Sequence, residues 1–335
     1  MSKKILVTGG FGFIGTTLVE LLLKRGGAHL HVIDDMSTSP IQVDDFLEQI
    51  GHPGNLTYDL TTVEEFFNRS DVGNWDQIYH LASPVGPAGV LRHAGNMVRD
   101  VVRDAYLIID YAMERGIKIL DVSTSEIYGG GQSGYCPEST PKIVPAITTV
   151  RLEYAIAKLA AETAITNCCE CRGLNATIVR PFNVAGPRQS PKGGFVLPRF
   201  MQQAYDGKPL TVFGDGSAVR AFTHVKDMAN GIILAMEHGR NGVAYNVGNP
   251  DNKTTILELA QRVLNVVGGP SEITFVDPRT IYGNYYAEAN DKYPDAKMAQ
   301  TELGWKPEYG IDETVADALA EYKRQLECAT LKDRV

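Results

Sequence analysis

The stretch Ile5-Leu-Val-Thr-Gly-Gly-Phe-Gly-Phe-Ile-Gly15 decides the fold of this chain. It leads from an apolar, β-branched segment through Gly9, Gly12 and Gly15 into an amphipathic segment. A helix N-terminus exposes unpaired N–H groups and a partial positive charge, so a pyrophosphate binds there if no Cβ blocks its approach. We expect Gly9 to serve the turn, Gly12 the close approach, and Gly15 the helix–strand contact. The stretch predicts a strand–turn–helix unit that binds a dinucleotide.

A carboxylate ends the second expected strand, in Val32-Ile-Asp34-Asp35. It follows the glycine turn by about 20 residues, where an acid accepts hydrogen bonds from the adenosine ribose hydroxyls. Because a carboxylate there repels a 2′-phosphate, NAD is favoured over NADP. We choose Asp34, since the last apolar residue of the strand precedes it, and Asp35 is the alternative. Asp59, after the third strand, either meets the adenine amino group or caps the helix that begins near Thr61.

Short apolar strands alternate with longer amphipathic segments through the first half of the chain. Such strands pair in parallel through right-handed crossovers, which gives a doubly wound sheet. The expected strands are Lys4–Thr8, His29–Asp34, Leu56–Leu60, Gln77–Ala82, Lys118–Ser123 and Ala176–Arg180.

The second half of the chain has shorter elements and clustered glycines and prolines. Later helices are expected over residues 226–238, 254–267 and 311–326. The sequence thus predicts an α/β fold, a Rossmann-type doubly wound parallel sheet with a smaller C-terminal α/β substrate lobe. We expect an NAD-binding Rossmann domain over residues 1–180 and a mainly substrate-binding lobe over 181–335, with some segments returning to the Rossmann domain.

Composition and charge exclude several classes of protein. The 335 residues carry 32 Lys and Arg against 40 Asp and Glu, a net charge of −8, with 44% hydrophobic residues. This composition is globular, and the acidic balance argues against nucleic-acid binding, which needs clustered cations. No apolar run approaches the ~18 to 20 residues of a membrane helix, and we expect no targeting segment. We therefore expect a cytoplasmic protein without nucleic-acid or membrane partners.

The five cysteines predict neither a disulfide framework nor a metal site. Three of them crowd into Cys168-Cys-Glu-Cys171, and no second pair or nearby histidine completes a zinc ligand set. We expect reduced cysteines and no bound metal.

Tyr154 and Lys158 lie four residues apart, so they share one face of a helix. An ammonium beside the phenol, with the positive nicotinamide ring close by, stabilises the phenolate and lowers the pKa of Tyr154 towards neutrality. Ser123-Thr-Ser-Glu126 ends the fifth strand and makes the signal more specific. His80, on an apolar strand, is expected to be a packed, hydrogen-bonded histidine and not a base.

Nine motifs in a fixed order identify a family resemblance. They are Thr8-Gly-Gly-Phe-Gly-Phe-Ile-Gly15, Tyr79-His-Leu-Ala-Ser-Pro84, Ser123-Thr-Ser-Glu-Ile-Tyr-Gly129, Tyr154-x-x-x-Lys158, Arg180-Pro-Phe-Asn183, Gly186-Pro-Arg188, Val212-Phe-Gly-Asp-Gly216, Arg220-Ala-Phe-Thr-His224 and Leu303-Gly-Trp305. Over nearly its whole length the chain resembles the extended short-chain dehydrogenases/reductases of the nucleotide-sugar epimerase, dehydratase and decarboxylase group. The His-Leu-Ala-Ser-Pro run, the Thr-Ser-Glu triplet and the Arg151-x-x-Tyr154 spacing look closest to UDP-glucuronate decarboxylases, which make UDP-xylose.

The resemblance implies roles for individual residues. Tyr154 would remove the 4-hydroxyl proton, Lys158 would hold the phenolate and the nicotinamide ribose, and Thr124 would bond the same sugar oxygen. Glu126 is the informative position, because simple 4-epimerases usually carry an uncharged residue there. The implied catalytic residues are Tyr154, Lys158, Thr124, Ser125 and Glu126. The implied cofactor-binding residues are Gly9, Gly12, Phe13, Ile14, Gly15, Asp34, Asp59, Leu60, Leu81, Ala82, Ser83, Tyr154, Lys158 and Pro181.

The implied substrate-binding residues are Pro84, Asn183, Val196, Phe213, Arg220 and Lys292. Asn183 and Arg220 resemble ligands of the sugar diphosphate, and Phe213 would flank the nucleotide base. Three segments depart from the family pattern. Relatives often have Asn-Thr-x-Gly where this chain has Val101-Val-Arg-Asp104, and the decarboxylases have an arginine where this chain has the lysine of Lys292-Tyr-Pro294-Asp295. The third segment, Val85-Gly-Pro-Ala-Gly89, is expected to be a small, smooth loop. Lysine offsets a carboxylate's charge but cannot form the bidentate fork of arginine.

The leading hypothesis for function is UDP-glucuronate decarboxylation through a 4-keto sugar, with NAD as a catalytic group that shows no net redox change. UDP-sugar 4-epimerisation, of the UDP-glucuronate or UDP-glucose type, and 4,6-dehydration share the first step and stay open. A noncatalytic NAD-binding regulator is the distant alternative. The helices near 96–114 and 151–168 resemble the paired dimer helices of the family, so we expect a homodimer.

Overall fold

Seven parallel strands form the central sheet of the computed structural model, which describes residues 2–129, 134–144, 146, 149–282 and 291–332. The strand order is β3-β2-β1-β4-β5-β7-β12. The strands are β1 (Lys3–Thr8), β2 (Ala28–Asp34), β3 (Leu56–Leu60), β4 (Gln77–His80), β5 (Lys118–Val122), β7 (Asn175–Pro181) and β12 (Ala244–Val247). The order reverses between β1 and β4, and in doubly wound sheets ligands bind in the crevice at this switch point. The predicted fold class is confirmed.

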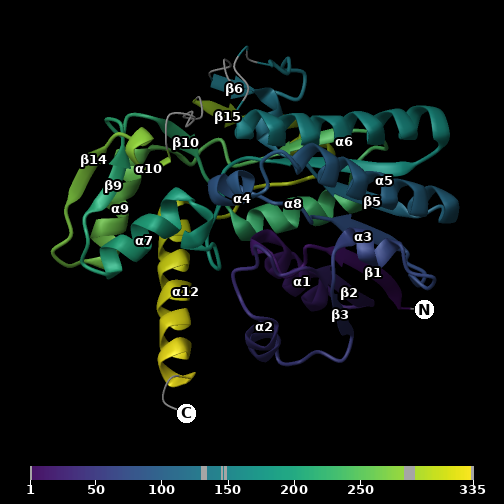
Figure 1. The fold of residues 1–335 in the computed structure, drawn as a ribbon, viewed down its shortest axis with the longest axis horizontal. Coiled ribbons are helices and arrows are strands. Elements are labelled where there is room, and N and C mark those ends of the chain that lie inside the picture. The colour runs from purple at the N-terminus through teal and green to yellow at the C-terminus, as the bar shows by residue number, and fades with distance from the viewer. Residues whose placement is uncertain (1, 130–133, 145, 147–148, 283–290, 333–335) are drawn as a thin grey trace.

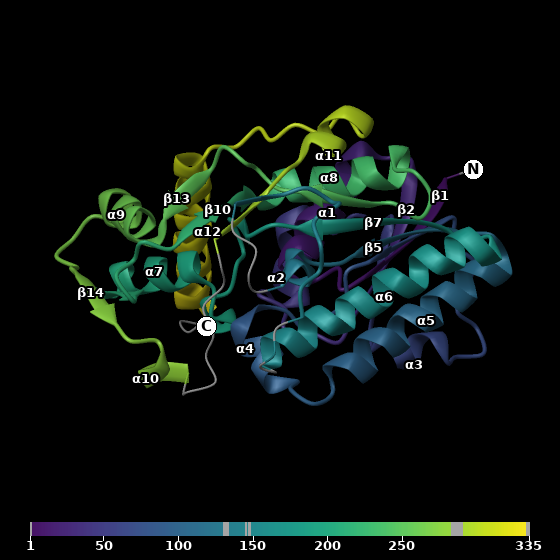
Figure 2. The same ribbon diagram turned by 90° about the horizontal axis from the view of Figure 1, so that it is seen from above.

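Helices cover both faces of this sheet (Figures 1 and 2). One face carries α1 (Phe13–Arg25), α8 (Val225–His238) and α11 (Lys297–Glu302), and the other carries α3 (Val63–Phe67), α5 (Met97–Arg115) and α6 (Val150–Arg172). Successive residues of β1 point to opposite faces, so Ile5 and Val7 pack in one core and Leu6 in the other. All three are nearly inaccessible to solvent, which explains the continuous apolar character of the strand.

The smaller lobe is built from the second half of the chain and lies to the left in Figures 1 and 2. Its helices share an apolar core. They are α7 (Val196–Tyr205), α9 (Ile256–Val267) and α12 (Ile311–Lys332). Its paired strands are β9 (Leu210–Phe213) with β14 (Ile273–Val276), and β10 (Val219–Ala221) with β13 (Lys253–Thr255).

Two further strand pairs lie near the junction with the sheet: β8 (Val184–Ala185) with β11 (Thr223–His224), and β6 (Gly134–Cys136) with β15 (Lys292–Pro294). The short elements α2 (Val43–Ile50), α10 (Arg279–Tyr282), η1 (Ser125–Tyr128) and η2 (Pro191–Gly193) complete the described chain. The expected strand and helix bounds agree with the structure to within two residues, except that α12 continues to Lys332. The boundary at residues 180 and 181 stays a prediction. In the described part of the chain, no helix is long and apolar enough to cross a membrane.

The expected loop over residues 85–89 is wrong, because helix α4 (Gly86–Arg92) begins there. Extended Val85 is its N-cap, and Pro87 stands in its first turn, where a missing N–H costs nothing. Gly86 has a φ of +75°, and a Cβ on it would lie 2.6 Å from Cζ of Phe195. Glycine therefore lets this helix pack closely against the smaller lobe.

Candidate active site

The glycine turn between β1 and α1 leaves no room for larger residues. Gly9 has a φ of +70°, and a Cβ on it would lie 2.7 Å from the backbone nitrogen of Ala82. A Cβ on Gly15 would lie 2.1 Å from the carbonyl oxygen of Gly9. Gly12 is the N-cap of α1, so Phe13 and Ile14 open the helix with N–H groups that no helical carbonyl accepts. This bare helix N-terminus fits the pyrophosphate of NAD.

The carboxylate of Asp34 lies beside this turn at the end of β2. It accepts hydrogen bonds from the backbone N–H groups of Phe11 (3.0 Å) and Met36 (2.8 Å), and from the Ser39 hydroxyl (3.1 Å). Burial raises the pKa of Asp34, and these hydrogen bonds oppose the rise. Asp35 instead bonds the backbone and hydroxyl of Ser37 on an exposed turn. Of the two acids, Asp34 bonds the glycine turn itself through the N–H of Phe11, and its contact with the ribose stays a prediction.

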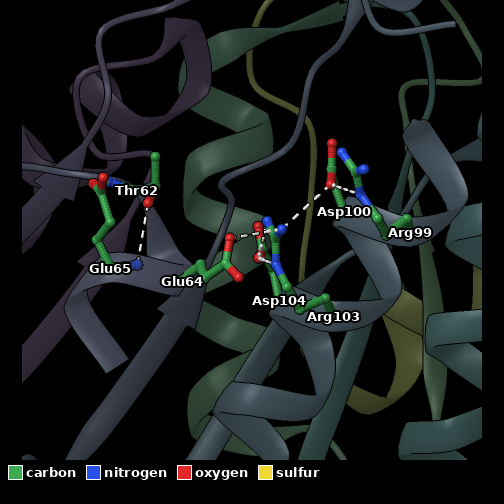
Figure 3. Close-up of polar contacts among 7 residues, drawn as sticks. All are labelled: Thr62, Glu64, Glu65, Arg99, Asp100, Arg103 and Asp104. Carbon is green, nitrogen blue, oxygen red and sulfur yellow. Dashed lines mark hydrogen bonds and ion pairs between the residues drawn. The ribbon is translucent and has the colours of Figure 1, made fainter. Parts of the chain in front are cut away.

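The last two residues of β3, Asp59 and Leu60, lie beside the end of β2. Leu60 is in register with Asp34 and is 58% exposed. Asp59 forms an ion pair with Arg69, and the cap of helix α3 is Thr62, whose hydroxyl accepts a hydrogen bond from Glu65 N–H (Figure 3). The alternative of Asp59 as a helix cap is therefore wrong.

Leu81, Ala82 and Ser83 follow β4 and pass over the end of β1. The N–H of Leu81 donates to the carbonyl of Thr8 (3.0 Å), and that of Ala82 donates to the Thr8 hydroxyl (3.2 Å). Pro181, the last residue of β7, pairs with Val247 of β12. These segments all lie at the carboxyl ends of the strands, as the sequence predicts.

Tyr154 and Lys158 lie on the buried side of α6, and both are nearly inaccessible to solvent. The Lys158 ammonium donates a hydrogen bond to the carbonyl of Val122 (2.9 Å). The side chains of Tyr154 and Thr124 are hydrogen-bonded to each other, and the Thr124 hydroxyl also accepts from the N–H of Glu126 (3.1 Å). Ser125 is buried within η1. The structure thus brings together the catalytic residues that the sequence implies.

The pKa of Tyr154 differs from the expectation. Burial raises this pKa above its usual value, the hydrogen bond with Thr124 lowers it, and the carboxylates of Glu126 and Asp121 raise it. Lys158 bonds a backbone carbonyl and not the phenol. The chain's own groups therefore do not produce the predicted lowering, and its carboxylates act against it.

Glu126 lies between two cations from distant parts of the chain. Its Oε1 is 3.1 Å from Nζ of Lys292, and its Oε2 is 2.7 Å from Nε of Arg151. Burial favours the neutral acid, but the Lys292 ammonium and the Arg151 guanidinium outweigh it and hold the pKa of Glu126 at about 2. The carboxylate is therefore ionised at neutral pH.

Lys292 reaches Glu126 because β15 pairs with β6, and its own pKa is lowered by burial. Arg151 was not among the site residues predicted from the sequence. The three-residue spacing between Arg151 and Tyr154 could have identified it, because this spacing places both side chains on one side of α6.

The other implied substrate residues come from separate elements of the chain. Asn183 has a φ of +37°, and its amide donates to the carbonyl of Ala221 (3.4 Å). Arg220 is buried, and its Nη1 lies 3.1 Å from Oδ1 of Asp291. Phe213 ends β9 with the Arg199 guanidinium 4.1 Å above its ring, whereas Pro84 and Val196 lie near the N-termini of α4 and α7.

His80 is packed and hydrogen-bonded, as predicted. Its Nδ1 lies 2.7 Å from the Thr8 hydroxyl, and burial together with the Lys158 charge lowers its pKa to about 3. It is therefore neutral at physiological pH. The five cysteines, all within the described residues, are free, and no group of three or more metal-ligating side chains occurs among those residues.

Comparison with known proteins agrees with this geometry. The model of the NAD dependent epimerase/dehydratase family matches residues 5–248. The chain is 31% identical over 327 residues to UDP-N-acetyl-alpha-D-glucosaminuronate decarboxylase of Bacillus cytotoxicus, covering 94% of this chain and 97% of the relative. It is 33% identical over 314 residues to UDP-glucuronic acid decarboxylase 6 of Arabidopsis thaliana, covering 93% and 86%.

A solved structure is similar over the same extent. UDP-glucuronic acid 4-epimerase from Bacillus cereus, in complex with UDP-glucuronic acid and NAD, superposes with a TM-score of 0.82 at 25% identity. The match covers 96% of this chain and 99% of the epimerase. The family match extends from the first strand through the glycine turn, the Tyr154–Lys158 pair and Asn183 to the end of β12. The chain therefore belongs to the NAD dependent epimerase/dehydratase family.

Proposed function

We propose that this protein is a UDP-glucuronate decarboxylase that works through a 4-keto sugar. One observation carries the proposal: Lys292 and Arg151 flank Glu126, so two cations and one carboxylate leave a net charge of +1. A uronate bears a negative charge at C6 that such a cluster attracts, whereas the neutral hydroxymethyl group of UDP-glucose needs no cation. The decarboxylases among the similar proteins support the same choice.

The two parts of the chain bind different molecules, the cofactor and the nucleotide sugar. Residues 1–180 bind NAD, mainly through the glycine turn and Asp34, and residues 181–335 bind the UDP moiety, with Asn183 and Arg220 at the diphosphate and Phe213 at the base. NAD supplies hydride exchange at C4, which makes the uronate a β-keto acid. Tyr154 accepts the 4-hydroxyl proton and later returns it, while Thr124 orients that oxygen.

The cations around Glu126 then govern the loss of carbon dioxide. When the bond between C5 and C6 breaks, its electron pair moves into the C4 carbonyl, and C5 must gain a proton. Ionised Glu126, with a pKa of about 2, cannot donate that proton at neutral pH. The Lys292 ammonium, whose pKa is lowered by burial, is the proton donor next to it, whereas the Arg151 guanidinium keeps its charge. The same state disfavours 4,6-dehydration with Glu126 as acid, because departing hydroxide needs a proton.

UDP-glucuronate 4-epimerisation is the second candidate, since the same cationic cluster would hold the uronate without breaking a bond. The similar epimerase was solved with UDP-glucuronic acid and NAD. Product masses separate the candidates after the purified protein is incubated with NAD and a panel of UDP-, TDP- and GDP-sugars that includes both UDP-uronates. Loss of carbon dioxide supports our proposal, loss of water indicates dehydration, and an unchanged mass with a new retention time indicates epimerisation.

We also propose that the enzyme is a cytoplasmic homodimer that pairs through α5 and α6. The five free cysteines fit a reducing compartment. A shallow groove of about 770 Å³ runs over the two helices and is lined by Tyr106, Val144, Ile156 and Leu159. Tyr106 and Ile156 are 44% and 37% exposed, and pairing of two copies would bury them.

Light scattering at micromolar concentration is expected to give twice the 36.6 kDa of one chain. Ile156→Asp should convert the dimer to monomer, because it puts a charge into an apolar interface. Val266→Asp is the matched control, since Val266 is 41% exposed on α9 in the smaller lobe. A monomeric mass for the native protein would refute the dimer.

A further inference from the structure

Lys158 is a buried ammonium, only 2% exposed, so its charge needs compensation within the protein. Burial lowers the pKa of Lys158, and the carboxylates of Asp121, Glu162 and Asp104 raise it, Asp121 most strongly. The three acids come from β5, α6 and α5, and they differ in how far other cations already neutralise them.

Two of these carboxylates already pair with arginines. Glu162 accepts hydrogen bonds from Nε and Nη2 of Arg180, at distances down to 2.7 Å. Asp104 accepts two from Nε and Nη2 of Arg103, at 3.0 and 2.9 Å, as Figure 3 shows. Glu162 therefore has a guanidinium bound to it in two places, and Asp104 shares the Arg103 guanidinium with Glu64 and Asp100. Both carboxylates have a direct cationic partner, which reduces their effect on Lys158.

Asp121 is in a different situation. It is 2% exposed on β5, directly before Val122, whose carbonyl accepts the Lys158 ammonium. Its Oδ1 lies 4.0 Å from Nε2 of His80, and its Oδ2 has no hydrogen-bond partner among the described residues. Because His80 is neutral at physiological pH, it does not balance the charge of Asp121.

We propose that Asp121 is the buried counter-charge of Lys158 and a positioning residue for the Tyr154–Lys158 pair. Asp121 faces His80 from β4 and Lys158 and Glu162 from α6, and its charge also acts on Tyr154. It keeps Lys158 protonated and directed at the strand end, and it sets how readily the phenol gives up its proton. This role rests on the proposed function only in that Tyr154 is the base.

The sign of the effect follows from the charge. Burial raises the pKa of Asp121 to about 6, so Asp121 is largely ionised at pH 7. Its negative charge raises the pKa of both Tyr154 and Lys158. Asp121→Asn removes that charge at nearly constant shape, so both pKa values should fall. The shift should be larger for Lys158, on which Asp121 acts most strongly of the three carboxylates, than for Tyr154.

The test measures each group separately in the NAD-bound enzyme. Tyrosine labelled with ¹³C at Cζ reports the Tyr154 titration, assigned by its absence in Tyr154→Phe, and needs no turnover. In Asp121→Asn we expect its midpoint to fall measurably, and the acid and basic limbs of the plot of kcat against pH to move to lower pH together. Because the titration is independent of the reaction, it holds even if the enzyme proves to be an epimerase.

Asp104→Asn is the matched control, because Asp104 acts on Lys158 and not on Tyr154. This variant should move the basic limb of the plot of kcat against pH and leave the Tyr154 midpoint unchanged.

Asp121→Leu replaces the amide variant if Asp121→Asn folds poorly, and it should lower the Tyr154 midpoint in the same way. An unchanged or raised Tyr154 midpoint in the folded variant would overturn the proposal, as would equal midpoints in Asp121→Asn and Asp104→Asn.

Discussion

Tyr154→Phe is expected to lower turnover by ~10² to 10⁴-fold, whichever nucleotide sugar is supplied. The change removes the proton acceptor for the 4-hydroxyl and the hydroxyl that pairs with Thr124, but keeps the ring in its apolar cluster with Val101, Ala157 and Ala161. All three candidate reactions begin with oxidation at C4, so all three should fail. Single-turnover formation of reduced cofactor measures this first step directly.

The control makes the same tyrosine-to-phenylalanine substitution at a position that is not among the proposed catalytic residues. Tyr135→Phe also removes one hydroxyl, from a side chain that is 54% exposed and bonded to Lys253. It should leave the first step within a few-fold of the native rate. NAD affinity should be similar in both variants, because the glycine turn and Asp34 are untouched. Near-native C4 oxidation by Tyr154→Phe would remove Tyr154 as the base.

Glu126→Gln is expected to spare the first oxidation and stall the enzyme afterwards. The amide leaves Lys292 and Arg151 without the carboxylate between them, so the local charge rises from +1 to +2. A substrate carboxylate should bind this cluster more tightly and lose carbon dioxide more slowly, because its ground state is stabilised. Overall turnover should fall by ~10²-fold or more, the size of effect seen when one group that tunes the electrostatics of the transition state is removed.

The measurement is accumulation of the 4-keto sugar with absorbance near ~340 nm from reduced nicotinamide. Glu114→Gln is a suitable control, because Glu114 is a surface residue whose side chain is 73% exposed at the end of α5. If the enzyme is an epimerase, Glu126 has no separate step, and turnover of Glu126→Gln should stay close to native. That result would replace the decarboxylase proposal with the epimerase.

The sequence alone determined the features that depend on neighbours along the chain. The glycine spacing predicts the turn between β1 and α1, and apolar periodicity predicts six of the seven strands of the central sheet to within two residues. Four-residue spacing predicts that Tyr154 and Lys158 share a helix face. Such patterns are readable because helix and strand periods repeat over a few residues.

Only the tertiary structure decided which distant segments meet and how the site residues are charged. Lys292 is 166 residues beyond Glu126, and the pairing of β15 with β6 brings them together. Strand β12 enters the sheet from the second half of the chain, and α4 forms where small residues predict a loop. Burial raises the pKa of Tyr154, and charges from distant segments lower that of Glu126. Folding also buries Asp121, which is 2% exposed. Desolvation and long-range ion pairs exist only after folding, so no local pattern encodes them.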